Sequence, residues 1–285
     1  MPVSPTLRHW QLADLLREHR DRSGLTIEQA AERLREFSPR WSRSKLQRIE
    51  GRIYPPQPAE VAHLAAVYAV SASDAAVMTE MAKDARRKGW WQASALPKRA
   101  HLLAGLEQAA TTIREFQLVL IPGLLQTSDY ARALLAATDP GASIEITEGF
   151  VAARMIRQQI IKREDPVEFQ AVISEAALCC PIGGARVMRN QLERLIEVTD
   201  EQHLTIQVLP FAAGGHAGLE GQFKLLTLPG IEHDIGYVEG QMGGVYLESQ
   251  DDIRRCTMRF SAVSTMALNP ADTRRWLEAK LSEYR

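Results

Sequence analysis

The chain has 285 residues, of which 45% are hydrophobic and 24% are charged, so it holds enough apolar material for one large or two ordinary folded domains. No apolar run reaches the roughly 20 residues of a membrane-spanning helix, and the first residues lack the basic and apolar segments of a signal peptide, so we expect a cytoplasmic protein with no membrane partner. The net charge of -1 hides an asymmetry, because residues 1–100 hold 17 Lys and Arg against 11 Asp and Glu, whereas residues 101–285 hold 17 against 24. A basic first part beside an acidic remainder indicates one domain that faces nucleic acid and one with another role, although chance clustering of surface charge is the alternative.

Five short helices are predicted for the first 88 residues. The first runs from Leu7 to Arg22, with its leucines near one face and Gly24 as a stop signal. The others cover residues 26–34, 42–51, 58–68 and 73–88, with Thr26, Ser42 and Ser73 as N-caps. Trp41 is expected to anchor the connection before the third helix in the core.

Residues 89–100 are predicted to form a linker, and residues 101–285 are predicted to form the second domain. Its pattern predicts helices at about 101–115, 128–137, 147–163, 185–199, 250–265 and 270–284. Strands are predicted at 116–122, 167–174, 204–209, 222–228, 235–238 and 243–247. The expected fold class is therefore an all-α helix-turn-helix domain of five helices followed by a mixed α/β domain with a small, mostly antiparallel sheet.

The third predicted helix has two faces of opposite character. Leu46 and Ile49 form an apolar stripe, and the remaining surface carries cationic and amide side chains without an acid before Glu50. Such side chains match base edges and phosphates in the major groove, and the helix follows another across a turn, as in a helix-turn-helix. We therefore predict contacts with base edges from Arg43, Ser44 and Gln47.

Phosphate contacts are expected around this helix. The start of the second helix offers its positive dipole end to phosphate oxygens. The predicted phosphate contacts are Thr26, Gln29, Arg40, Lys45, Arg48 and Arg52. The partner would be a double-stranded DNA operator, read by a homodimer whose half-sites lie about 34 Å apart. A solvated helical hairpin in an unrelated bundle is the alternative.

Several polar residues of the second domain stand in unusual positions. Arg154, Gln158, Glu175, His216 and Glu239 are candidates for an effector or partner pocket. They could equally form buried ion pairs that join helix to sheet, or line a catalytic site. No nucleophilic Ser or Cys accompanies His216, so no catalytic residue is assigned and we do not expect an enzyme.

The cysteines favour neither a metal nor a disulfide. Cys179 and Cys180 are adjacent and Cys256 stands alone, so no pair has zinc spacing. We expect reduced thiols, no metal site and no cofactor.

The first domain resembles the Xre family of repressor-type helix-turn-helix domains. The resemblance rests on residues 25–34, on residues 42–50 with Arg48-Ile49-Glu50, and on Pro55-Pro56. The chain departs from the family in its long connection from Arg35 to Trp41 and in Gly51 directly after Glu50. The resemblance implies sequence-specific DNA binding by a cytoplasmic, nucleoid-associated protein.

The remainder resembles the domain of unknown function found in WhiJ-like actinobacterial regulators. The matching residues include 116–127, Tyr130-Ala131-Arg132, Arg157-Gln158, 174–178, 207–211, 237–239 and 246–248. The resemblance implies a transcriptional regulator of development or secondary metabolism, often encoded beside a very small partner protein that binds it. The alternatives are a regulator that senses a small molecule and an enzyme tethered to DNA by its first domain.

Overall fold

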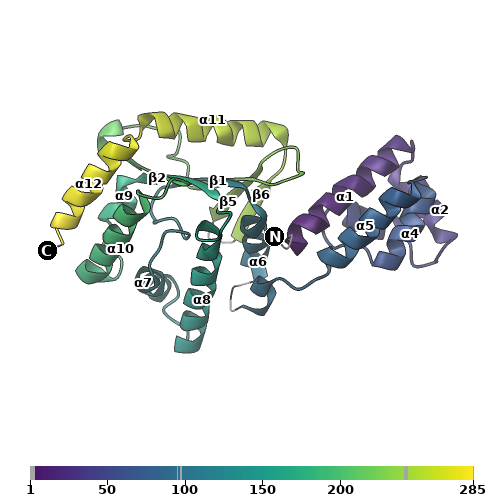
Figure 1. The fold of residues 1–285 in the computed structure, drawn as a ribbon, viewed down its shortest axis with the longest axis horizontal. Coiled ribbons are helices and arrows are strands. Elements are labelled where there is room, and N and C mark those ends of the chain that lie inside the picture. The colour runs from purple at the N-terminus through teal and green to yellow at the C-terminus, as the bar shows by residue number, and fades with distance from the viewer. Residues whose placement is uncertain (1–3, 95, 97, 241–242, 285) are drawn as a thin grey trace. The chain divides into compact units, whose positions relative to one another are not determined.

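The computed structural model describes residues 4–94, 96, 98–240 and 243–284, and the chain divides into two compact units with the boundary between residues 93 and 94. The first unit is helical (Figure 1). Its α-helices are α1 (Pro5–Arg22), α2 (Ile27–Arg35), α3 (Arg43–Glu50), α4 (Pro58–Val67) and α5 (Ala72–Ala85), followed by the short 3-10 helix η1 (Trp90–Ala93). The predicted fold class of this part, with five helices, is confirmed.

Local side chains fix where these helices begin. The Thr26 hydroxyl accepts from the Gln29 N–H while the Gln29 side chain accepts from the Thr26 N–H, and the Ser42 hydroxyl accepts from the Lys45 N–H. Both predicted caps are confirmed. The predicted cap of the fifth helix is wrong, because Ser71 rather than Ser73 accepts from the Asp74 N–H and the helix ends near Ala85.

The core of the first unit joins all five helices. The fully buried members of one apolar cluster include Leu12 and Leu16 of α1, Leu46 and Ile49 of α3, and Leu64 of α4.

 The largest of the fully buried side chains is Trp41, whose Nε1 donates to His63 Nδ1 at 3.2 Å, so the connection before α3 is anchored in the core as predicted. This packing fixes α3 against α1, α2 and α4 and leaves its polar face outside.

A buried ion pair reinforces the position of α3. Arg20 Nε donates to Glu50 Oε1 and Oε2 at 3.1 and 2.9 Å, and the Tyr68 hydroxyl donates to Glu50 Oε1 at 3.1 Å. Arg20 Nη1 also donates to the Leu25 carbonyl at 2.8 Å. The side chains of Arg20 and Glu50 are only 9% and 4% exposed, so Glu50 depends on Arg20 for compensation, whereas Arg20 Nη1 also lies 2.7 Å from Oδ1 of the more exposed Asp21.

The second unit is a mixed α/β domain, as the predicted fold class states. Its described strands form a six-stranded sheet in the order β3-β2-β1-β4-β5-β6. The strands are β1 (Thr112–Gln117), β2 (Glu168–Ser174), β3 (Leu204–Leu209), β4 (Phe223–Thr227), β5 (Ile235–Gly240) and β6 (Gly243–Leu247). The β1–β2 and β2–β3 pairs are parallel, and the other three pairs are antiparallel.

Helices cover both faces of this sheet (Figure 1). One face carries α11 (Gln250–Met266), which packs on Phe116, Val172 and Leu225 through Cys256, Phe260 and neighbouring side chains. Figure 1 places α6, α8 and α10 on the other face. The helices of this unit besides α11 are α6 (Lys98–Ala109), α7 (Ser128–Thr138), α8 (Ile144–Arg157), α9 (Glu175–Cys179), α10 (Gly184–Val198) and α12 (Pro270–Ser282), with 3-10 turns η2 (Gln158–Ile161) and η3 (Phe211–Ala213).

One predicted strand lies in the wrong place. The sequence favours an extended strand at residues 116–122, whereas β1 covers Thr112–Gln117. Arg114 and Glu115 made this segment look unlike a buried strand, but each has a partner of opposite charge, since Arg114 pairs with Asp234 and Glu115 with Lys224. Tertiary ion pairs thus let a charged sequence occupy the middle of the sheet.

We predict that Glu50→Gln destabilises the first unit by about 3 kcal/mol, because it leaves the buried Arg20 guanidinium with only the largely exposed Asp21 as a counter-charge. The measurement is urea unfolding of the full chain. The control is Glu18→Gln, which removes an exposed pair with Arg22 and should cost less than about 1 kcal/mol. Equal effects of the two substitutions would contradict the prediction.

Candidate DNA interface and a buried polar cluster

The α3 helix presents a polar face to solvent. Leu46 and Ile49 are fully buried, whereas Arg43, Ser44 and Gln47, the predicted base contacts, are exposed. The Ser42 cap leaves the first turn of the helix at the surface. The structure therefore brings the three predicted base contacts onto one accessible helix.

Arg43 is held by an acid from the neighbouring helix. Its Nε lies 2.7 Å from Glu28 Oε1 of α2, and both side chains are more than half exposed. The pKa of Glu28 is lowered, first by its own backbone N–H and then by the charge of Arg43. An exposed pair of this kind contributes little stability, so Arg43 can leave Glu28 for a stronger acceptor.

Four of the predicted phosphate contacts are exposed. Thr26 and Gln29 stand at the start of α2, where their side chains close a capping box. Arg40 lies in the connection before α3, and the guanidinium carbon of Arg48 lies 4.9 Å from the centre of the Tyr54 ring. All four side chains are therefore accessible at the surface of the first unit.

The other two predicted phosphate contacts are engaged within the unit. Lys45 forms an ion pair with Glu60, and its Nζ lies 4.4 Å from the centre of the Trp41 ring. Arg52 Nη2 donates to Asp14 Oδ1 and Oδ2 at 2.8 and 2.7 Å. Only 19% of the Lys45 side chain and 17% of the Arg52 side chain are exposed, so both are held by the fold.

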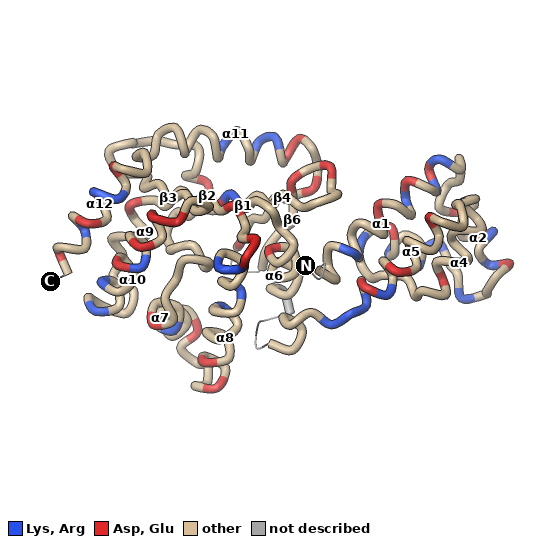
Figure 2. The backbone as a smooth tube through the Cα atoms, in the orientation of Figure 1, with Lys and Arg blue, Asp and Glu red and all other residues tan. Residues whose placement is uncertain are grey.

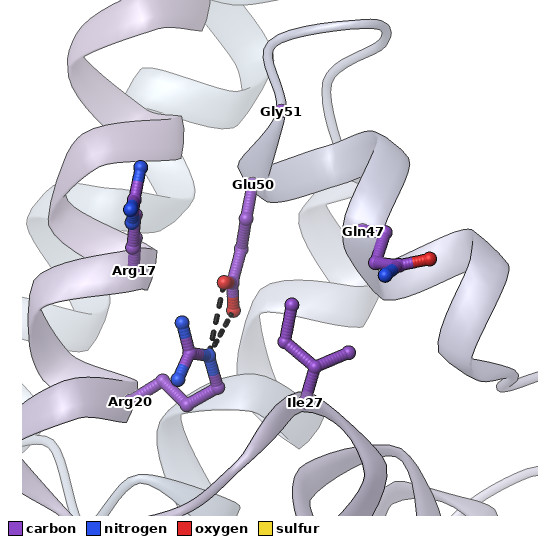
Figure 3. Close-up of a pocket in the computed structure, with 6 residues that line it drawn as sticks. All are labelled: Arg17, Arg20, Ile27, Gln47, Glu50 and Gly51. Carbon is purple, nitrogen blue, oxygen red and sulfur yellow. Dashed lines mark hydrogen bonds and ion pairs between the residues drawn. The ribbon is translucent and has the colours of Figure 1, made fainter.

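Arg17 is a cation beside α3 that the sequence did not single out. An open pocket of about 200 Å³ lies between α1, α2 and α3, lined by Arg17, Arg20, Ile27, Gln47, Glu50 and Gly51. Figure 3 shows Arg17 and Gln47 on opposite sides of Glu50, which points toward Arg20. Arg17 is exposed, and its position on the polar face of the first helix was the only signal in the sequence.

A row of polar residues crosses the sheet of the second unit. Glu115 pairs with Lys224 in register, Lys224 with Tyr237, and Tyr237 with Tyr246. Residues that oppose one another in register point to the same face of a sheet. Glu115, Lys224 and Tyr237 are all buried, so this part of the interior is polar rather than apolar.

Two helices complete the polar cluster. Glu107 of α6 accepts from Arg157 Nε and Nη2 of α8 at 2.8 and 2.9 Å, and from Lys224 Nζ at 2.6 Å. Lys224 Nζ also lies 3.1 Å from Glu115 Oε2. In Figure 2, acidic and basic positions meet where α6 approaches β1. Burial alone would raise the pKa of Glu107, but the charges of Arg157 and Lys224 lower it to about 2.

Arg154 and Gln158 extend this cluster toward the loop after β1. Arg154 Nη1 donates to Gln126 Oε1, and the guanidinium carbon lies 4.7 Å from the centre of the Phe150 ring. Gln158 Nε2 donates to the carbonyls of Gly123 and Gln126 at 3.1 and 2.7 Å. Burial, followed by the charge of Arg157, lowers the pKa of Arg154 to about 10. The structure thus joins two of the five predicted pocket residues through Gln126.

The remaining predicted pocket residues have separate surroundings. Glu175 Oε2 accepts from the Phe211 N–H at 2.7 Å, and His216 Nδ1 accepts from the Gly218 N–H at 3.1 Å while its ring meets Phe116 edge-on. Glu239 is exposed at the end of β5 and contributes to the field around Arg154. Of the three, Glu239 is therefore the one associated with the polar cluster.

The described residues offer neither a cluster of metal ligands nor a helix suited to a membrane. They contain no group of three or more His, Cys, Asp or Glu side chains arranged to hold a metal ion. None of the helices in the described part of the chain has the length and apolar character to span a bilayer.

Comparison with known families divides the chain in the same order. A family described as "Domain of unknown function (DUF5753)" matches residues 100–279. A family described as "Helix-turn-helix domain" matches residues 11–78, which include α2 and α3. No curated protein and no solved structure matches the chain.

We predict that Glu107→Gln destabilises the second unit at neutral pH by about 3–5 kcal/mol, because Arg157 and Lys224 lose their shared counter-charge. The folded-state pKa of Glu107 is lowered, so its stabilisation is present above about 4.5 and is lost as the pH falls toward about 2. The difference between the variant and the original chain should therefore shrink between about pH 5 and about pH 3.

Urea unfolding across this pH range measures the effect. Glu193→Gln removes an exposed pair with Arg189 and serves as the control, with an expected cost below about 1 kcal/mol. A Glu107→Gln penalty that stays constant down to about pH 3 would show that the charge of Glu107 does not stabilise the domain.

Proposed function

The chain belongs to the family defined by this domain of unknown function, and we propose that it is a sequence-specific transcriptional regulator that reads an operator through α3. The helix-turn-helix match indicates DNA binding, and the finer assignment rests on one observation. That observation is the accessible face of α3, which carries Arg43, Ser44 and Gln47 beside the capped start of α2. Guanidinium, hydroxyl and amide groups on one helix suit recognition of base edges in the major groove.

A homodimer suits recognition of an operator by such a short helix. The α3 helix has eight residues and can reach only a few base pairs, whereas two copies related by a two-fold axis read two half-sites. We propose such a dimer, with half-sites about 34 Å apart, acting in the cytoplasm at the nucleoid. Analytical ultracentrifugation with and without operator tests it, and a single copy on a full-affinity operator would rule it out.

We propose that the second domain receives a regulatory signal, with a small partner protein as the first candidate. The family resemblance to WhiJ-like regulators supports the partner, and with it a role in development or secondary metabolism. A small-molecule effector is the second candidate, favoured by the buried cluster around Arg154 and Lys224. Co-purification with the product of the adjacent gene tests the first candidate, and failure to retain it would count against a partner.

Catalysis is the third hypothesis for the second domain, and we propose that this domain is not an enzyme. Two of its candidate residues, Glu175 and His216, accept hydrogen bonds from backbone N–H groups of neighbouring loops, which supports a structural role for them. The test is to introduce Glu175→Gln in a cell that depends on the regulator and to measure its fold, its DNA binding and any chemical activity. Loss of a chemical activity with fold and DNA binding intact would overturn it.

We predict that Arg43→Ala relaxes base preference at one position of each half-site, worth about 1–3 kcal/mol of discrimination. The operator is first obtained by selection from random duplexes with the full chain. Binding to the selected duplex and to its single-base variants is then compared by mobility shift. Lys83→Ala, which removes an exposed cation paired with Glu80 on α5, is the matched control. An unchanged base preference for Arg43→Ala would show that another residue reads the sequence.

The salt dependence of binding separates two predicted phosphate contacts. Arg40 is exposed, so Arg40→Ala should lower the slope of log K against log salt concentration by about one. Arg52 is held by Asp14, so we expect Arg52→Ala to leave that slope unchanged and to cost about 1 kcal/mol of stability instead. A lower slope for Arg52→Ala would show that Arg52 leaves Asp14 for phosphate.

A further inference from the structure

Four buried polar atoms in the described part of the second domain make no hydrogen bond with a described residue. They are Arg154 Nε, the Tyr246 hydroxyl, Ser264 Oγ and Glu115 Oε2, and the last of these still lies 3.1 Å from Lys224 Nζ in an ion pair. Arg154 and Tyr246 share their electrostatic neighbours, since Arg157, Glu107 and Glu239 act on both. Buried polar groups in folded proteins nearly always have a hydrogen-bond partner, so two donors without one beside the same group of ion pairs require an explanation.

Four charges of this cluster compensate one another, whereas the charge of Arg154 has no direct counter-charge among the described residues. Arg157 and Lys224 share Glu107, and Lys224 also meets Glu115, so these four groups compensate one another. The ion pairs of the described residues give Arg154 no carboxylate, and its hydrogen-bond partner is the neutral amide of Gln126. Glu239 acts on it from an exposed position at the end of β5. A buried guanidinium whose direct partner is an amide favours the approach of an anion.

The cluster also lies where α/β sheets commonly bind ligands. The chain leaves β1 toward the parallel strand β2 on one side, and β1 has the antiparallel strand β4 on its other side. Gln126 lies in the loop that follows β1, and Glu239 lies near the end of β5. In open α/β sheets, ligands bind outside the carboxyl ends of the strands where the strand order reverses.

The two tyrosines of the row are held in place by the edge strand. Their ring centres are 5.1 Å apart. A Cβ at Gly244 of β6 would come within 2.0 Å of the Tyr237 ring, so the ring occupies space that only glycine leaves open. This close fit holds Tyr237 against β6 and fixes the ring beside which Tyr246 stands.

We propose that this cluster is a binding site for a small molecule that carries an oxyanion group, either a carboxylate or a phosphate. Arg154 Nε and the Tyr246 hydroxyl donate to its oxygens, and Gln126 holds the guanidinium in place. Arginine has only donors, and a guanidinium matches the planar edge of either oxyanion. The inference rests on the proposed role of the second domain as the receiver of a regulatory signal, and it names the chemistry of that signal.

The test is thermal unfolding of the full chain without DNA. Sodium phosphate and sodium acetate are titrated separately as probes, with sodium chloride at matched ionic strength as the reference. Phosphate also stabilises folded proteins by exclusion from their surface, so the measured quantity is the part of the shift in Tm that saturates with concentration. Saturation with phosphate alone assigns a phosphate group to the ligand, and saturation with acetate alone assigns a carboxylate.

Two variants locate the site. Arg154→Gln should weaken the apparent affinity for the effective probe by about tenfold or more, because a charge-assisted hydrogen bond is lost. Tyr246→Phe should weaken it about threefold to tenfold while leaving the Tm without probe equal or higher, because it removes a buried hydroxyl that has no partner among the described residues. Arg132→Gln, at an exposed arginine of α7 paired with Glu148, should bind like the original chain.

The proposal is overturned if neither probe gives a saturable shift, or if the shift persists unchanged in both Arg154→Gln and Tyr246→Phe. Persistence would place the anion elsewhere, for example on the exposed cations of the first unit. If Arg154→Gln does not fold, Tyr246→Phe still decides the question. Because no DNA is present, this result is independent of operator binding, and the selection from random duplexes tests the proposed regulator separately.

Discussion

The ion pair between Arg20 and Glu50 is the constraint on which the first unit depends. It joins the end of α1 to the end of α3, and the Tyr68 hydroxyl adds a contact from the end of α4. Apolar packing through Leu46 and Ile49 brings α3 into the core, but such packing is not directional. The buried charges add direction, since a small rotation of α3 would separate two groups that have no water to replace their partner.

Buried ion pairs also fix the positions of elements in the second unit. Glu107, Arg157 and Lys224 connect α6, α8 and β4, so they fix the helices above the sheet by ion pairs as well as by packing. The row from Glu115 to Tyr246 then keeps one face of the sheet polar. A face of this kind costs stability compared with an apolar one, because every buried charge in it must be compensated.

Features that depend on residues close together in the chain could be predicted from the sequence. The caps at Thr26 and Ser42, the order of helices and five of the six strand positions follow from local patterns. Partners distant in the sequence were not visible: Lys45 looked free for phosphate, yet it pairs with Glu60 in α4. The same limit hid β1, because the charge of Glu115 is compensated by Lys224, more than a hundred residues away. The exposure of Arg43 was predictable because it follows from the spacing of the buried Leu46 and Ile49 along one helix, whereas its ion pair with Glu28 was not.

The shared charges of Glu107, Glu115, Arg157 and Lys224 have a consequence for how relatives of this chain can diverge. Loss of any one member leaves the group of four with one uncompensated buried charge, so a single change at these positions should destabilise the domain. Exchange of the whole set for apolar residues of similar volume carries no such penalty. The four positions should therefore be inherited together or replaced together, and their joint variation across relatives would mark which lineages keep the polar interior.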